Sequence, residues 1–220
     1  MSIKSLSFVA AAALALCAGA TQAATVNGFA NGGFEMAGTT TPADAWLKAA
    51  SGYTLSSDAH SGSFSAQLAS PALNAAVMLQ NSKDQGGLMD LTAGDNPTLS
   101  FWAKGNAGGT GNLVFALRFL DNNGNIKFNS GDQHFEGAIN SSGWTQITYT
   151  PSVVPVGATA AFIEFSQGIG PIDTNLPAGR VLIDDVYLGV TAAVPEPETY
   201  ALMLAGLGVV GALVRRRRAA

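Results

Sequence analysis

The chain has 220 residues, of which 47% are hydrophobic and only 12% are charged, about half of the ~25% charged share of an average soluble domain. This composition excludes a disordered, highly charged tail protein, and the formal net charge of −4 gives no electrostatic basis for a nucleic-acid partner. The 26 glycines favour many short elements joined by turns over long helices.

The first 23 residues have the three parts of a secretory signal peptide. Lys4 supplies the basic start, Leu6–Gly19 is apolar, and small residues lead to a cleavage position after Ala23. The alternative is a buried N-terminal helix. Cleavage would remove Cys17, the one cysteine of the chain, and leave a mature protein without disulfide bonds or a thiol nucleophile.

Residues 24–193 are predicted to form one all-β domain, a jelly-roll β-sandwich. Apolar and polar residues alternate with a period of two, as in Leu99–Lys104, and Asn123-Gly124 marks a hairpin turn. We expect about ten strands and no long amphipathic helix. The clearest candidate strands are residues 53–57, 63–69, 75–80, 99–104, 113–120, 126–128, 144–150, 160–165 and 181–188.

The predicted mature domain is acidic. It contains six Lys or Arg residues and thirteen Asp or Glu residues, which gives a formal net charge of −7 over residues 24–193. Such a domain is not expected to bind anionic polymers by its overall charge.

Five short motifs carry a resemblance to a known fold family. In chain order they are Asn31–Glu35, His60–Leu68, Leu99–Gly105, Gly143–Thr145 and Leu182–Val186. This order is similar to that of the galactose-binding-like jelly rolls, which include many carbohydrate-binding modules. The resemblance implies a jelly-roll fold and a carbohydrate, here an extracellular polysaccharide, as the ligand.

The same resemblance implies a structural calcium ion. It assigns Ca²⁺ to Glu35 and Asp184, with Asp185 as the substitute ligand, and backbone carbonyls around residues 58–62 would complete the shell. Calcium prefers six to eight oxygen ligands, and a buried unpaired carboxylate is costly. The alternative is that the two adjacent aspartates point to opposite faces and meet Lys, Arg or water.

Aromatic and cationic residues are the candidates for a sugar-binding face, because sugar rings stack on aromatic side chains while polar neighbours bind the hydroxyls. We predict binding by Trp102, Trp46, Tyr53 and Arg118, with Gln133 and His134 as polar neighbours. Core packing is the alternative for Trp102 and Trp46, and Trp144 is expected to be a packing residue.

The sequence predicts no enzyme. The two histidines, His60 and His134, lie in no metal-binding pattern, and no Gly-x-Ser-x-Gly nucleophile motif occurs. Glu136 and Glu164 could serve a glycosidase, yet nothing fixes their separation. A structural biofilm-matrix protein and, less favoured, a glycan hydrolase remain the alternatives to a binding module.

The C-terminal segment, residues 194–220, has three parts. The acidic, extended stretch Val194–Glu198 precedes the uncharged run Tyr200–Val214. A helix over that run is about 22 Å long, short for a bilayer core of about 30 Å, although flanking arginines can snorkel and hold their end in the cytoplasm. The predicted sorting residues are Pro195, Glu196, Pro197, Arg215, Arg216, Arg217 and Arg218.

This order of parts resembles the PEP-CTERM sorting signal of Gram-negative bacteria. The resemblance implies export through the inner membrane, a transient membrane anchor formed by a single transmembrane helix, and cleavage by the transpeptidase exosortase. It further implies a final location at the cell surface or outside the cell, among exopolysaccharide-producing or biofilm-forming bacteria. The alternative is an ordinary tail anchor with a stiff stalk.

Overall fold

The computed structural model describes residues 27–69, 75–84, 91–109, 111–168 and 178–191, with a few further single positions between 170 and 176 and between 206 and 215. The predicted signal peptide and the Pro-Glu-Pro motif lie outside the described residues, as does most of the predicted helix over 200–214. Within the part of the chain that is described, no helix is long and apolar enough to span a membrane.

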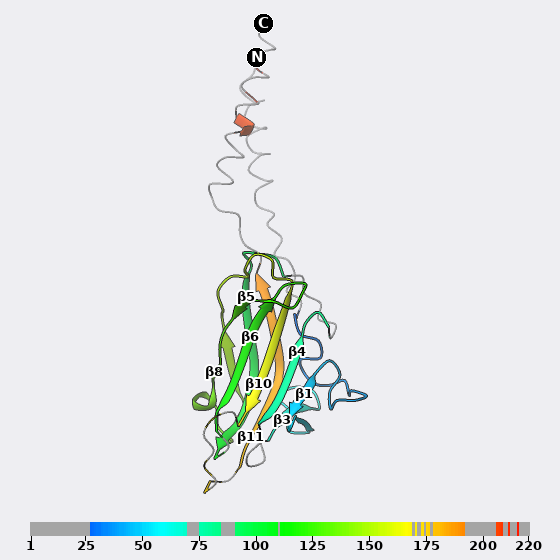
Figure 1. The fold of residues 1–220 in the computed structure, drawn as a ribbon, viewed down its shortest axis with the longest axis vertical. Coiled ribbons are helices and arrows are strands. Elements are labelled where there is room, and N and C mark those ends of the chain that lie inside the picture. Colours follow the sequence, from blue (N-terminus) through cyan, green and yellow to red (C-terminus); the bar gives the residue numbers. More distant parts are fainter. Residues whose placement is uncertain are drawn as a thin grey trace, which may run out of the picture.

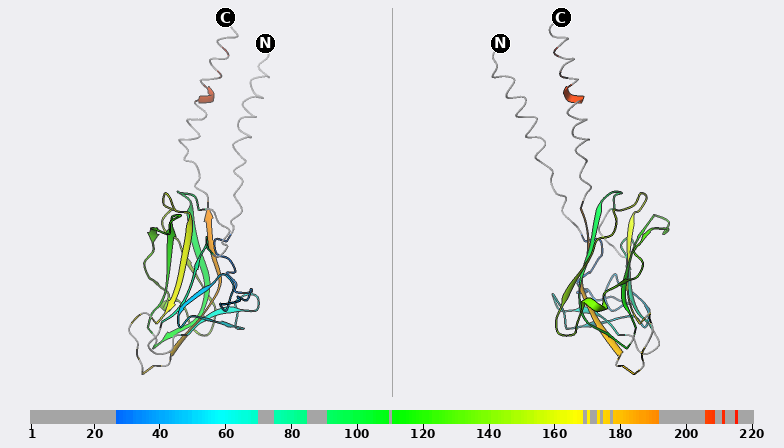
Figure 2. Two further views of the ribbon diagram at one scale, coloured as in Figure 1. Left: turned by 45° about the vertical axis from the view of Figure 1, so that its right-hand side comes forward. Right: turned by 90° about the vertical axis from the view of Figure 1, so that its left-hand side faces the viewer.

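Two antiparallel sheets face each other across one core (Figures 1 and 2). The described strands are β1 (Leu47–Ala50), β2 (Thr54–Ser56), β3 (Ser65–Leu68), β4 (Ala76–Asn81), β5 (Asn96–Gly108), β6 (Leu113–Leu120), β7 (Ile126–Asn129), β8 (Gln133–His134), β9 (Thr145–Tyr149), β10 (Ala160–Gln167) and β11 (Ala178–Thr191), with a 3₁₀ turn at Glu136–Ala138. The prediction of an all-β sandwich is confirmed.

The strand order is that of a sandwich with crossovers between the layers. One sheet has the order β1-β4-β10-β6-β7 with β8 also paired to β6, and the other has the order β2-β3-β11-β5-β9. We call them the six-stranded and the five-stranded sheet. The strands and the core lie within residues 27–191, so this segment is expected to fold by itself.

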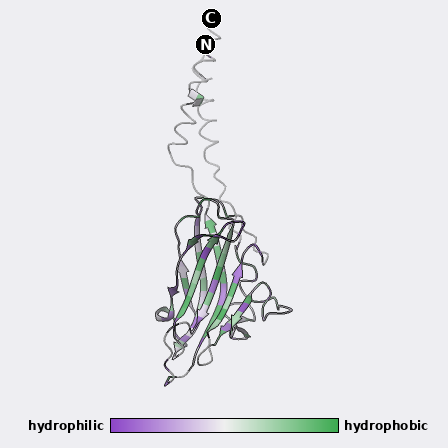
Figure 3. Cartoon of the chain, viewed as in Figure 1, coloured by the Kyte–Doolittle hydropathy of each residue, from purple (hydrophilic) through white to green (hydrophobic). Residues whose placement is uncertain are grey.

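The predicted alternation explains how the sheets bury their inner faces. In β5, Leu99, Phe101 and Ala103 are buried, while Trp102 and Lys104, on the alternate positions, are partly exposed. Because side chains alternate across a strand, the partly exposed set points away from the core. Hydrophobic and hydrophilic residues accordingly follow each other along several strands (Figure 3).

Aromatic rings fill the space between the sheets. Phe101 of the five-stranded sheet makes edge contacts with Phe115 and Phe165 of the six-stranded sheet, with ring centroids 5.4 and 4.9 Å apart. Burying each phenylalanine contributes about 1.5–3 kcal/mol. This inter-sheet contact fixes which face of each sheet remains for solvent and ligands.

The hairpin predicted from Asn123-Gly124 is confirmed between β6 and β7. The Asp121 carboxylate accepts backbone N–H groups of Asn123 and Asn125, both at 2.9 Å, and Gly124 adopts the positive φ of +80°. Hydrogen bonds, above all those from Asn125, hold the pKa of the Asp121 carboxyl well below its usual range.

Candidate functional site

The site begins at an irregularity in β11. Its pairing with β5 runs to Asp184 opposite Trp102, and resumes only with Tyr187 opposite Ser100. Asp185 lies in this β-bulge with a φ of +49°, a left-handed conformation that a non-glycine residue adopts only when its surroundings hold it. The bulge places the two adjacent aspartates against the same loop, residues 60–64.

Both aspartates bind this loop directly. Asp184 is fully buried, and its Oδ2 accepts the backbone N–H groups of His60 and Ser61 at 2.8 and 3.2 Å. Asp185 Oδ2 lies 2.7 Å from His60 Nδ1, and its Oδ1 accepts the Ser61 hydroxyl at 2.6 Å. Burial raises the pKa of Asp184 to about 6, although its three backbone hydrogen bonds act in the opposite direction.

Glu35 binds the other end of the same loop. Its Oε1 accepts the backbone N–H groups of Ser63 and Phe64, both at 2.8 Å. A Cβ on Gly62, which has a φ of +63°, would lie 2.5 Å from that oxygen, so a larger residue would break this contact. Residues at both ends of the domain sequence therefore fix loop 60–64.

Glu35, Asp184 and Asp185, the residues predicted to hold calcium, thus contact the same loop, but through N–H groups where the resemblance implied carbonyls. Among the described residues, no group of three or more His, Cys, Asp or Glu side chains has the geometry to hold a metal. The carboxylates of Glu35 and Asp184 fit a calcium shell chemically, whereas the N–H groups that now face them do not.

His60, at the start of loop 60–64, contacts two tryptophan rings. We define the aromatic patch as His60, Trp102 and Trp144. The imidazole stacks on Trp102 with centroids 3.8 Å apart and an interplanar angle of 12°. Trp144, just before β9, meets His60 edge-on at 5.8 Å. Trp102 points away from the core, because Phe101 and Ala103 beside it in β5 are buried. His60 and Trp144 lie with it on the outer side of the five-stranded sheet.

A cation flanks this patch. Lys104 Nζ lies 5.9 Å from the Trp144 ring centroid and pairs with Asp58 at 2.8 Å. Two exposed residues of β9 lie beside the patch: Gln146 is paired with Trp102, and Thr148 is paired with Ser100. The patch therefore combines aromatic rings with hydroxyl, amide and charged groups.

Trp46 and Tyr53 were predicted to bind sugar, and the structure corrects this for both. Trp46 is fully buried, packs on Phe34 at 5.1 Å and donates its ring N–H to Asn31 O. Tyr53 is 4% exposed, and burial raises the pKa of its hydroxyl. Both are core residues, so neither ring can meet a ligand at the surface.

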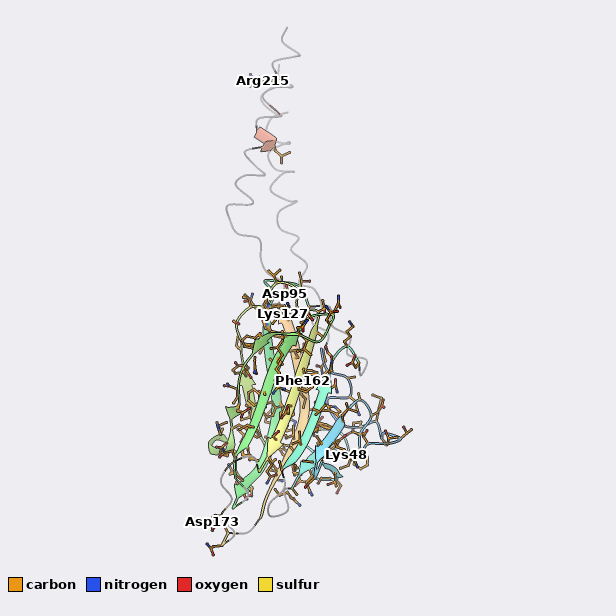
Figure 4. All side chains as sticks on the ribbon, in the orientation of Figure 1. Lys48, Asp95, Lys127, Phe162, Asp173 and Arg215 are labelled. Carbon is orange, nitrogen blue, oxygen red and sulfur yellow. The ribbon has the colours of Figure 1, made fainter. Side chains whose placement is uncertain are left out.

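Arg118 lies on the opposite side of the molecule from Trp102. It belongs to β6 of the six-stranded sheet, where it lies 3.2 Å from Glu164 and 5.2 Å from the Phe162 ring. Figure 4 marks Phe162 in the middle of that sheet. One sugar chain cannot contact Trp102 and Arg118 through a single flat face, so the two are separate candidates.

The polar neighbours predicted beside these residues are in the six-stranded sheet as well. Gln133 and His134 form β8, which pairs with β6. His134 Nδ1 lies 3.0 Å from Glu136 Oε1, and the Gln133 amide donates to Ser130 O at 2.6 Å. They therefore belong to the same sheet as Arg118 and not to that of Trp102.

Sequence reasoning missed His60 and Trp144 as site residues. His60 begins the motif His60–Leu68, but nothing in that stretch indicates the stacking on Trp102, which depends on the bonds from Asp184 and Asp185 to the loop. It also lies beside Ser61 and Asp185, yet the serine hydroxyl donates to the carboxylate. Serine catalysis needs that hydroxyl to donate to the imidazole, so the trio does not have the arrangement of a catalytic triad.

Comparison with known proteins gives one match at the C-terminus. Residues 193–218 match the family model of the PEP-CTERM protein-sorting motif, which confirms the motif predicted from residue 194. No curated protein resembles the chain closely enough in sequence to count as a relative.

Several solved structures are similar to the sandwich. The enzymatically active domain of tailspike protein 4 from bacteriophage CBA120 has 22% identity and a TM-score of 0.57, and the match covers 75% of this chain and 21% of that one. TmCBM61, solved with β-1,4-galactotriose, has 18% identity, a TM-score of 0.45 and coverages of 74% and 97%. The CBM22-1 xylan-binding domain of Paenibacillus barcinonensis Xyn10C has 15% identity, a TM-score of 0.45 and coverages of 74% and 93%.

At these identities the likeness concerns the fold alone. The neighbours include carbohydrate-binding modules as well as an enzymatically active domain. The chain thus combines a C-terminal PEP-CTERM protein-sorting motif with a jelly-roll sandwich whose structural neighbours include carbohydrate-binding modules.

Proposed function

We propose that this protein is an exported, non-catalytic surface or matrix protein that binds extracellular polysaccharide through its sandwich. The sorting motif at residues 193–218 supports export through the inner membrane of a Gram-negative bacterium, transient anchoring and cleavage by exosortase. The protein would then act at the cell surface or in the extracellular matrix.

The aromatic patch is the observation that carries the binding proposal. The stacked pair His60 and Trp102 and the edge-on Trp144 lie on a sheet face rather than in the core. Aromatic rings supply the apolar surface on which a pyranose stacks, and polar groups around them bind its hydroxyls. Gln146, Thr148 and Lys104 surround the rings with such groups.

Affinity electrophoresis of two variants of segment 24–193 tests whether the sugar binds at the aromatic patch of the five-stranded sheet. Trp102→Ala should reduce retention in a polysaccharide gel by about fivefold or more, since loss of one aromatic ring costs about 1–3 kcal/mol where a nucleic-acid base stacks on it. Arg118→Ala, on the opposite sheet, should leave retention within about twofold.

A thermal melt of each variant separates lost binding from lost folding. If Arg118→Ala abolishes retention and Trp102→Ala does not, the sugar lies on the six-stranded sheet and our assignment of the face is wrong. If no polysaccharide retains the folded wild-type segment, the function is that of a structural matrix protein.

We also propose a structural Ca²⁺ held by Glu35 and Asp184, with Asp185 as the substitute ligand and carbonyls of residues 58–62 completing the shell. Support comes from the convergence of these carboxylates on one loop and from the burial of Asp184. A cation would offset the desolvation of that carboxylate and its repulsion from Asp185. The ion would fix loop 60–64 and, through it, His60.

Removing calcium should therefore lower the melting temperature. At a concentration 100 times its Kd a ligand stabilises the fold by about 2.7 kcal/mol, which corresponds to a shift of about 5–10 °C for a domain of this size. Glu35→Gln should abolish the effect of a chelator, and Glu164→Gln on the other sheet should keep it. An unchanged melt, together with no calcium in elemental analysis, would refute the proposal.

A further inference from the structure

A cavity of about 150 Å³ opens beside the aromatic patch. It is lined by Lys104, Gly105, Asn106, Ser141, Arg180 and Leu182. Lys104 also flanks Trp144, so this side chain lies between the cavity and the patch. Both belong to the outer face of the five-stranded sheet, and one elongated ligand can reach both.

The two cations of this cavity differ in their partners. Lys104 Nζ is paired with both carboxylate oxygens of Asp58, at 3.0 and 2.8 Å. Arg180 is exposed, and among the described residues no carboxylate lies within ion-pair distance of its guanidinium. A guanidinium offers two parallel N–H donors that match the two oxygens of a carboxylate.

The register of the sheet sets the distance between this cation and the rings. Arg180 is paired with Asn106, Leu182 with Lys104, and Asp184 with Trp102. Four residues of strand at about 3.3 Å each separate the row of Arg180 from the row of Trp102 by about 13 Å. Between them the side chain of Leu182 is only 1% exposed, so it does not project from the sheet between the cavity and the rings.

We infer that the polysaccharide bound by this face is acidic, with a carboxylate of one sugar held by Arg180 while a neighbouring ring stacks on the aromatic patch. The inference rests on the proposed function and adds the class of its ligand. A neutral sugar would leave the guanidinium to water, whereas a uronic acid makes charge-assisted hydrogen bonds with it. Because the domain carries a formal charge of −7 over residues 24–193, the recognition has to come from this local geometry.

The test uses polygalacturonate and alginate, each beside its carboxyl-reduced form, in affinity electrophoresis of segment 24–193. The acidic forms should retain the wild type at least about tenfold more strongly than the reduced forms, as expected for a hydrogen bond to a charged group. Arg180→Gln should remove this difference and leave retention by the reduced forms within about twofold. Lys48→Gln, an exposed cation of β1 in the other sheet, is the matched control and should behave as the wild type (Figure 4).

The outcomes separate the inference from the function. If Trp102→Ala abolishes retention by every polymer while Arg180→Gln changes none, the function stands and the acidic ligand is wrong. If Lys48→Gln loses as much as Arg180→Gln, or dextran sulfate retains the protein as well as the uronates, general charge attraction explains the result and the inference fails. If the folded protein is retained neither by these polymers nor by gels of the producing cells' own exopolysaccharide, glucans and xylans, both fail.

Discussion

Trp46→Ala should lower the free energy of unfolding by about 3–5 kcal/mol, the usual cost of removing a large buried aromatic ring. Trp46 is fully buried and touches Phe29, Phe34 and Phe165, with ring centroids 5.1–6.3 Å away. It joins the N-terminal segment to β10 of the six-stranded sheet. Since a domain of this size has a total stability of about 5–15 kcal/mol, the loss should be plain in a urea titration.

Two further variants make this result specific. Trp46→Phe keeps a ring but removes the hydrogen bond to Asn31 O, so it should lose about 1–2 kcal/mol and remain folded. Trp144→Ala removes a partly exposed ring and should cost about 1 kcal/mol or less. Equal losses for Trp46→Ala and Trp144→Ala would contradict the division between core and surface tryptophans.

Replacing Pro195, Glu196 and Pro197 together with alanine should leave the chain uncut and held in the membrane fraction. These residues lie in the segment that matches the sorting motif, and a peptidase that reads the motif would lose its recognition element. An immunoblot of membrane and culture fractions should show full-length protein in the membrane and almost none released. Thr199→Ala, one residue beyond the predicted motif, is the matched control.

Release of the triple variant at the wild-type level would refute exosortase sorting. Cleavage would then not depend on the Pro-Glu-Pro residues. If instead neither the wild type nor the variant is released, the segment would be a plain tail anchor and the Pro-Glu-Pro stretch only a stalk. The binding proposal does not depend on this outcome, because the sandwich lies within residues 27–191.

The alternation of side chains was enough to predict most strands. β5, β6, β10 and β11 were each foreseen from their apolar positions, because these strands bury one face against the other sheet. β1 was not foreseen, since all four of its residues are exposed and show no alternation. β8 has only two residues, too few for any pattern.

The candidate site was predicted only in part, because it depends on contacts between distant residues. Trp46 and Tyr53 stand in a stretch that looks like a loop, and only their contacts with distant elements place them in the core. Alternation separates Trp102 from the apolar positions 99, 101 and 103, but neither for Trp102 nor for Arg118 does it say to which sheet the strand belongs. The structure places them on opposite faces.

The measurement that tests our central claim most directly is affinity electrophoresis of segment 24–193 in gels that contain the producing cells' own exopolysaccharide, with common glucans and xylans alongside. We predict retention of the wild type in at least the native polymer, and loss of that retention in a folded Trp102→Ala variant. A folded wild-type segment that migrates freely through every gel would contradict carbohydrate binding and leave a structural role in the matrix.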